Sequence, residues 1–189
     1  MYNEGTLTLD NVTFNNNKAK TGNAVGGGAM ALVSAGTNPV NTTIKNSIFT
    51  NNSTETSNGA KNNGGAIYVY GTSSANAGEN TLNISDSLFK SNSTNKTGGA
   101  IGVNNLGPSD FEIEIKHTTF TENKSTGYGG AIDVTTGDTG GTGNVTLKLD
   151  HATFNGNESE SDGGAIAYEK GNITSNIINS TFKNNTANN

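Results

Sequence analysis

Gly64-Gly65-Ala66-Ile67 is one of four identical phrases in this sequence, and the others begin at Gly98, Gly129 and Gly163. A variant, Gly27-Gly28-Ala29-Met30, comes first, so that successive phrases start 37, 34, 31 and 34 residues apart. Self-similarity at such a period is the signature of a repeat architecture. The paired glycines predict a sharp turn in every repeat, because glycine tolerates positive φ and close backbone approach: Gly27, Gly28, Gly64, Gly65, Gly98, Gly99, Gly129, Gly130, Gly163 and Gly164.

A second phrase, Phe-x-x-Asn, accompanies the glycines. It occurs six times, and from the third to the fifth copy the phenylalanine lies a constant nine residues before the glycine pair. Most copies follow an alternating apolar run such as Leu147-x-Leu149. Apolar alternation with a period of two is typical of a strand with one buried face. Each repeat is therefore expected to contain two or three short strands.

Stacking of these repeats predicts an all-β parallel β-helix of about six coils, formed by residues 1–189 as a single repeat domain. Equivalent strands of successive coils then pair about 4.8 Å apart. The inward phenylalanines form a core column: Phe14, Phe49, Phe89, Phe120, Phe154 and Phe182. The asparagines after each strand form a hydrogen-bonded ladder, because an amide can cap a turn and bond the same amide one coil on: Asn17, Asn52, Asn92, Asn123, Asn157 and Asn185. Two further core columns run through the glycine-phrase strands, one from Met30 to Ile166 and one from Leu32 to Tyr168.

Composition and charge narrow the function classes. Only 30% of residues are hydrophobic, with 26 Gly and 32 Asn, which suits a solenoid whose narrow core needs few inward residues per coil. A net charge of −5, with eleven lysines and no arginine, argues against a nucleic-acid partner. No apolar stretch is long enough to insert in a membrane. The absence of cysteine excludes disulfides and thiolate metal sites.

The pairing of Phe-x-x-Asn with Gly-Gly-Ala-Ile resembles the repeats of the chlamydial polymorphic membrane proteins and similar adhesin-like β-helix repeats. The resemblance covers essentially the whole chain. It implies a right-handed, single-stranded β-helix at the cell surface or outside the cell, usually within a long passenger region that adheres to a host or neighbouring cell.

One repeat position, three residues before the phenylalanine, carries the candidate metal ligands. It holds Asp86, His117 and His151 in consecutive coils, where other coils have asparagine. A carboxylate and two imidazoles about 5 Å apart could bind a divalent metal. The favoured interpretation is a corner that accepts any small polar side chain, so no metal and no cofactor is expected.

Two acidic features were also considered. The loop Glu158–Asp162 offers oxygen ligands for calcium, but it lacks the spacing of an EF-hand and is expected to be solvated. Asp133 and Glu169 lie on neighbouring coils and could form a glycosidase pair, although they are offset by two residues within their repeats. Isolated surface acids are the simpler interpretation, and a polysaccharide lyase or hydrolase is the weakest of the functional hypotheses.

The leading hypothesis is a non-enzymatic adhesin-like module that binds a protein or glycan on another surface through its side wall. The loops 34–41, 53–63, 71–80 and 136–144 would supply specificity. Tyr68 and Tyr70, on adjacent outward positions, are expected to be exposed and are possible ligand contacts. The alternative is a subunit of an extracellular filament in which copies of the chain stack end to end, since no capping helix is recognisable at either end.

Overall fold

The computed structural model is described for residues 1–20, 26–55, 63–74, 78–137 and 143–189. These residues form 24 strands and no helix. All strand pairs are parallel, and they make four sheets of six strands each. The chain is therefore a parallel β-helix of six coils, and each coil contributes one strand to each sheet. We name the sheets A, B, C and D in the order in which each coil passes through them.

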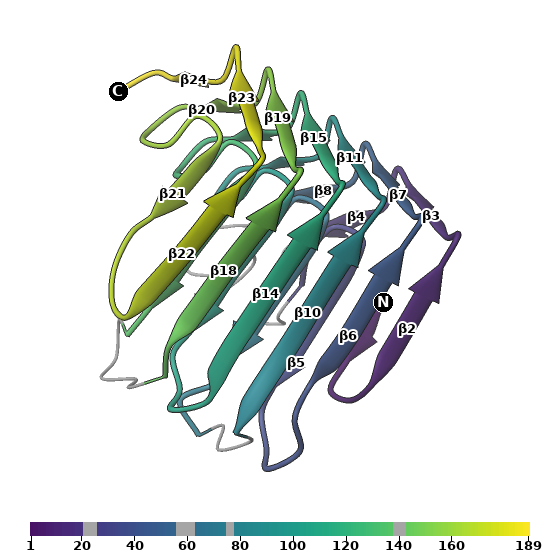
Figure 1. The fold of residues 1–189 in the computed structure, drawn as a ribbon, viewed down its shortest axis with the longest axis vertical. Helices are drawn as coiled ribbons and strands as arrows, with labels where there is room; N and C mark the ends of the chain where they lie inside the picture. The colour runs from purple at the N-terminus through teal and green to yellow at the C-terminus, as the bar shows by residue number, and fades with distance from the viewer. Residues whose placement is uncertain (21–25, 56–62, 75–77, 138–142) are drawn as a thin grey trace.

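Sheets A and B contain the longer strands. Sheet A follows the glycine phrases and consists of β1 (Tyr2–Asn3), β5 (Met30–Ser34), β9 (Ile67–Gly71), β13 (Ile101–Asn105), β17 (Ile132–Thr136) and β21 (Ile166–Tyr168). Sheet B consists of β2 (Leu7–Asp10), β6 (Asn41–Lys45), β10 (Glu79–Ser85), β14 (Asp110–Lys116), β18 (Val145–Asp150) and β22 (Ile173–Ile178). In Figure 1 the strands of sheet B lie side by side from β2, in purple, to β22, in yellow.

Sheets C and D are built from strands of two or three residues. Sheet C carries the phenylalanines and consists of β3 (Thr13–Asn15), β7 (Ile48–Thr50), β11 (Leu88–Lys90), β15 (Thr119–Thr121), β19 (Thr153–Asn155) and β23 (Thr181–Lys183). Sheet D follows the asparagines and consists of β4 (Lys18–Lys20), β8 (Ser53–Glu55), β12 (Ser93–Thr94), β16 (Lys124–Ser125), β20 (Glu158–Ser159) and β24 (Thr186–Ala187). The expectation of two or three strands per repeat was wrong, because sheet D adds a fourth.

The core lies between the sheets. The six phenylalanine rings stack in one column with centroids 4.6–4.8 Å apart, which is the spacing of successive coils. The column from Met30 to Ile166 is in register from strand to strand of sheet A. The last coil differs, because no coil of this chain covers its outer side. There Phe182 is 44% exposed and Tyr168, expected in the core, is 42% exposed.

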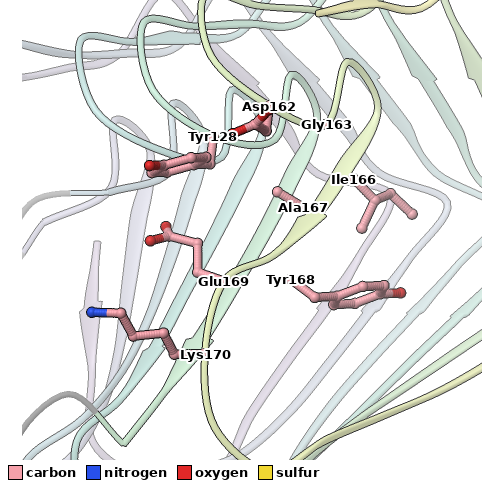
Figure 2. Close-up of a pocket in the computed structure, with 8 residues that line it drawn as sticks. All are labelled: Tyr128, Asp162, Gly163, Ile166, Ala167, Tyr168, Glu169 and Lys170. Atoms are coloured by element: carbon pink, nitrogen blue, oxygen red, sulfur yellow. The ribbon is translucent and has the colours of Figure 1, made fainter. Parts of the chain in front are cut away.

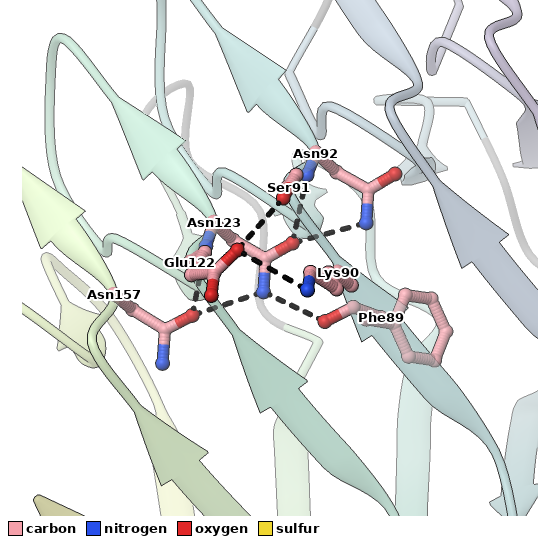
Figure 3. A network of polar contacts seen from close by, with 7 residues as sticks. All are labelled: Phe89, Lys90, Ser91, Asn92, Glu122, Asn123 and Asn157. Carbon is pink, nitrogen blue, oxygen red and sulfur yellow. Dashed lines mark hydrogen bonds and ion pairs between the residues drawn. The ribbon is translucent and has the colours of Figure 1, made fainter.

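The asparagines form a continuous ladder beside this core, part of which is drawn in Figure 3. Asn123 is fully buried; its Nδ2 donates to Asn157 Oδ1 at 2.9 Å and to the Phe89 carbonyl at 3.0 Å. Its Oδ1 accepts from the backbone N and the Nδ2 of Asn92, both at 3.0 Å. The same pattern runs through all six coils, from Asn17 to Asn185. Each amide therefore satisfies the backbone of the turn and ties one coil to the next.

Two corners of each coil use the left-handed backbone region. Between sheets B and C the corner residue has φ between 46° and 56° in every coil: Asn11, Asn46, Asp86, His117, His151 and Asn179. Between sheets C and D the equivalent residues have φ between 53° and 64°: Asn16, Asn51, Ser91, Glu122, Gly156 and Asn184. Asparagine, aspartate and histidine are enriched in this region among residues with a side chain. This explains why the B–C corner holds only those three residue types.

Candidate functional site

The candidate metal ligands stack at the B–C corner as the repeat spacing predicts. The rings of His117 and His151 have centroids 5.0 Å apart, and His117 Nδ1 lies 3.8 Å from Asp86 Oδ1. His151 Nδ1 instead contacts Asp150 Oδ1 at 2.7 Å. Within the described parts of the chain, no three histidine, cysteine, aspartate or glutamate side chains converge as metal ligands do. The left-handed backbone accounts for these residues without a ligand.

The two tyrosines are not exposed, so this expectation was wrong. Tyr68 is 0% and Tyr70 4% exposed, and their rings stack with centroids 5.5 Å apart. Strand alternation does place them on the outer face of sheet A, but that face is covered. They form a second apolar cluster with Ala31, Val33 and Leu106, separate from the core between the sheets. A surface ligand cannot reach the Tyr68 ring in this conformation.

The outer face of sheet A is covered in part by the turns that precede the glycine phrases. At Gly102 an added Cβ would lie 2.6 Å from Asn63 Cβ and 2.6 Å from the Gly64 backbone nitrogen, which belong to the turn of the preceding coil. The turns therefore pack directly on the sheet. This packing explains why side chains that point away from the core are nevertheless buried here.

The acidic pair lies on the same face, and the expectation of isolated surface acids was wrong. Asp133 is 0% exposed, and Glu169, half-buried, interacts directly with it. The pKa of Asp133 is raised from its ordinary 3.8 to about 8, mainly by burial and to a smaller extent by the neighbouring Glu169, while the hydroxyls of Thr97 and Thr135 oppose the shift. A substrate cannot approach the fully buried Asp133 carboxyl, which argues against the glycosidase interpretation of this pair.

A cleft opens beside Glu169 on the sixth coil. It is lined by Tyr128, Asp162, Gly163, Ile166, Ala167, Tyr168, Glu169 and Lys170. Figure 2 shows the Glu169 carboxylate extending toward the Tyr128 ring, on the side of the strand opposite Ile166 and Tyr168. The cleft therefore gives solvent access to Glu169, the half-buried member of the acidic pair.

Sheet B presents a polar outer wall. Lys148 donates to Glu112 at 2.7 Å, and Lys116 pairs with Glu114 at 2.8 Å. The pKa of Lys148 is raised by its hydrogen bond to Glu112, against a smaller opposing effect of desolvation. The wall thus combines both signs of charge with amides and hydroxyls.

A shallow groove follows the B–C corner in coils two to four, and we call it the corner groove. It is lined by Asn46, Ser47, Ile48, Asp86, Ser87, Leu88, His117 and Thr119. Ile48 is 40% exposed, and it pairs with Leu88 in a column of sheet C that otherwise holds threonine: Thr13, Thr119, Thr153 and Thr181. The corner groove therefore has an apolar centre within an otherwise polar wall. The interruption of the threonine column was its signal in the sequence.

The four loops expected to supply specificity are described only in part. Residues 34–41 lie within the described part, whereas residues 56–62, 75–77 and 138–142 of the other three loops lie outside it. The described chain contains no helix long and apolar enough to span a membrane.

Comparison with known proteins identifies the repeat. The family model of the Chlamydia polymorphic membrane protein repeat matches residues 117–135 and 151–169. Two segments of the chain are therefore similar to this repeat. Each matched segment begins at a corner histidine, passes through sheets C and D, and ends on sheet A after the glycine phrase. The strands of the neighbouring coils pair in register with the matched segments. No curated protein and no solved structure matches the chain.

Proposed function

We propose that this chain is an adhesin-like module of the cell surface, outside the membrane, that binds a protein or glycan on another surface. The observation that carries the proposal is the match of two coils to a repeat named for polymorphic membrane proteins. The fold supports it, because a solenoid whose coils are joined by the asparagine ladder displays a long continuous side wall.

The corner groove is the contact surface that we favour on this wall. Its centre, Ile48 and Leu88, gives apolar area, while Asp86, His117 and Asn46 supply a polar rim. Contact surfaces commonly combine an apolar centre with a polar rim. The buried tyrosines no longer serve as contacts, so the specificity is assigned to this groove and to the loops.

Binding of the fluorescently labelled chain to cultured epithelial cells, bacterial cells and a printed glycan array tests the proposal. The variant Ile48→Lys with Leu88→Lys is expected to lose at least about tenfold in affinity. A tenfold loss in affinity corresponds to about 1.4 kcal/mol of binding free energy, and loss of the buried apolar contact should cost at least that much. Thr153→Lys with Thr181→Lys is the matched control, because it adds the same charge to the same column three coils farther along. An equal loss of affinity in both variants would show that the corner groove is not the contact surface. Absence of binding by the unaltered chain to all three probes would contradict the proposed adhesion itself.

End-to-end filament assembly is the second candidate, and the open face of coil six favours it. In this chain Tyr168, Ile177 and Phe182 occupy core positions but are 42–44% exposed. Either a further coil or the first coil of a second copy, with Phe14 placed on Phe182, would cover them. Electron microscopy across a concentration series tests this. Continuous fibres of solenoid width support assembly, and monomers at every concentration contradict it.

A further inference from the structure

A group of buried oxygens lies on the outer face of sheet A. Tyr68 Oη, Thr97 Oγ1, Asn104 Oδ1 and Asp133 Oδ1 are all buried and make no hydrogen bond of good geometry among the described residues, although Tyr68 lies near Asn104 and Thr97 lies near Asp133. Buried polar atoms in folded proteins are nearly always satisfied. Several unsatisfied atoms in one place therefore indicate a missing partner.

The register brings these oxygens together. Gly102 of β13 pairs with Asp133 of β17, so Asn104, two residues after Gly102, is a diagonal neighbour of Asp133. Thr97 lies in the turn before the glycine phrase of the coil that contains Asn104, and it interacts with the Asp133 carboxyl. Glu169, one coil after Asp133, also interacts with this carboxyl. The Tyr68 hydroxyl interacts with the Asn104 side chain, and it interacts electrostatically with the Asp133 carboxyl. The oxygens come from three consecutive coils and one connecting turn.

Among the described residues, no positively charged group acts on the Asp133 carboxyl at the centre of this group. Asp133 is 0% exposed, and within the described chain it accepts one long hydrogen bond, 3.4 Å from Thr135 Oγ1 to Oδ2, beside looser contacts with Thr97 and Glu169. The groups that act on it are Thr97, Thr135 and Glu169, none of which carries a positive charge. A buried carboxylate must be paired, coordinate a cation, or take up a proton.

We propose that Asp133, Glu169, Asn104 and Thr97 form a binding site for a divalent cation, with calcium as the ion that fits best. Two carboxylates, an amide carbonyl and a hydroxyl are hard oxygen ligands, and calcium accepts them together with waters in flexible geometry. The set contains no imidazole or thiolate, which disfavours zinc and other transition metals. The cleft between Tyr128 and Glu169 gives the ion a route from solvent (Figure 2).

The site ties coils four, five and six together, because its ligands come from β13, β17 and the segment after β21. Bound calcium is therefore expected to stabilise the C-terminal half of the solenoid. The acidic loop Glu158–Asp162 is a separate feature, with Lys124 pairing Glu158 at 3.0 Å and Glu160 at 3.7 Å.

The test is calcium titration of the metal-free chain by calorimetry, together with thermal melting at pH 8 with and without calcium. We expect one calcium per chain and a rise in Tm of about 5–10 °C at a calcium concentration about 100 times Kd. Asp133→Asn keeps the shape of the side chain but removes its charge, so both the binding and the Tm rise should be lost. Glu169→Gln should weaken binding, since it removes one anionic ligand.

Glu158→Gln with Glu160→Gln is the matched control, because it removes two exposed carboxylates from the same coil and should leave calcium binding unchanged. Two results would overturn the proposal. One is calcium binding that survives Asp133→Asn but is lost in the loop variant. The other is no calcium binding at all by a folded chain whose stability falls between pH 5 and pH 8, which would show that a proton, and not a cation, neutralises Asp133.

Discussion

Single side chains fix the stacking of this solenoid, and the ladder asparagines are the clearest case. Asn123 makes four hydrogen bonds in a fully buried position, to partners in the coils on both sides. Aspartate, leucine or alanine offers no substitute, because the position needs a donor and an acceptor at once. The amide therefore works as both a turn cap and a staple between coils.

Asn123→Ala should lower the free energy of unfolding by about 2–4 kcal/mol, because it removes the oxygen that accepts from the buried backbone N–H and from the side-chain amide of Asn92. Urea denaturation measures this change. Asn17→Ala is the control, since Asn17 is exposed in the first coil and, among the described residues, its side chain donates only to Asn52 Oδ1. It should cost roughly 1 kcal/mol. Equal costs at the two positions would contradict a role for burial in the ladder.

Asp133 gives the stability of the chain a distinctive pH dependence. An acid whose pKa rises from 3.8 in the unfolded chain to about 8 in the folded chain holds its proton more tightly when folded. In metal-free buffer its contribution is fully present below about pH 4 and is lost as the pH rises to about 8, by at most roughly 1.4 kcal/mol per pH unit. The groups that face Asp133 are Thr97, Thr135, Glu169 and Tyr68.

Urea denaturation of the unaltered chain and of Asp133→Asn at several pH values isolates this effect. The difference in stability between the two proteins should change steadily from pH 4 to pH 8 in favour of the variant. A difference that is constant over this range would show that Asp133 is not buried as a neutral acid.

At the scale of the elements, the glycine-phrase corner limits how closely coils stack. The second glycine of each phrase has no room for a side chain: an added Cβ at Gly99 would lie 2.0 Å from the Gly130 carbonyl oxygen and 2.7 Å from the Lys124 backbone nitrogen. Because both obstacles are backbone of the next coil, neither can move without parting the sheets.

Gly99→Ala should therefore destabilise the chain by about 3 kcal/mol or more, at the upper end of overpacking changes. Gly36→Ala is the matched control, since nothing lies within 4 Å of its added Cβ, and its effect should stay within about 0.5 kcal/mol. Thermal and urea denaturation of both variants measure the difference. A tolerated Gly99→Ala would mean that the coils are farther apart at this corner than the structure places them.

Sequence reasoning predicted the elements that are marked by a repeated local sequence pattern. Phenylalanine, asparagine and glycine phrases predicted the core column, the ladder and the turns, and alternation predicted sheet B. Sheet D escaped notice because its inward residues are small or polar, as in Thr54, Thr94 and Ser125, so no apolar period marks them. Thr54 Oγ1 donates to Thr94 Oγ1 at 2.7 Å, which shows that this part of the interior is held by hydroxyls.

The burial of Tyr68, Tyr70 and Asp133 could not be predicted from the sequence, because it depends on a turn of one coil covering the strand of the next. Alternation says which face of a strand a side chain occupies, but it does not say what lies over that face. One signal was present in the sequence. Asp133 is the only charged residue at its repeat position, where other coils have Ala31, Tyr68, Gly102 and Ala167.

For the whole molecule, the four sheets make a rigid wall whose length is set by the number of coils. The paired strands run unbroken from the first coil to the sixth in all four sheets. The two proposed sites lie on different parts of this wall, the corner groove between sheets B and C and the proposed cation site on the outer face of sheet A. Both proposals depend on the six coils being stacked in register.

The distance between spin labels at Thr13→Cys and Thr181→Cys, measured by double electron–electron resonance, tests this stacking most directly. Both positions are exposed, they occupy the same column of sheet C in the first and sixth coils, and the chain has no other cysteine. Five coil steps of about 4.8 Å place the two backbones about 24 Å apart, so one narrow distribution near that value is predicted. A broad distribution extending well beyond about 40 Å, as an unfolded segment of this length would give, would contradict the six-coil solenoid.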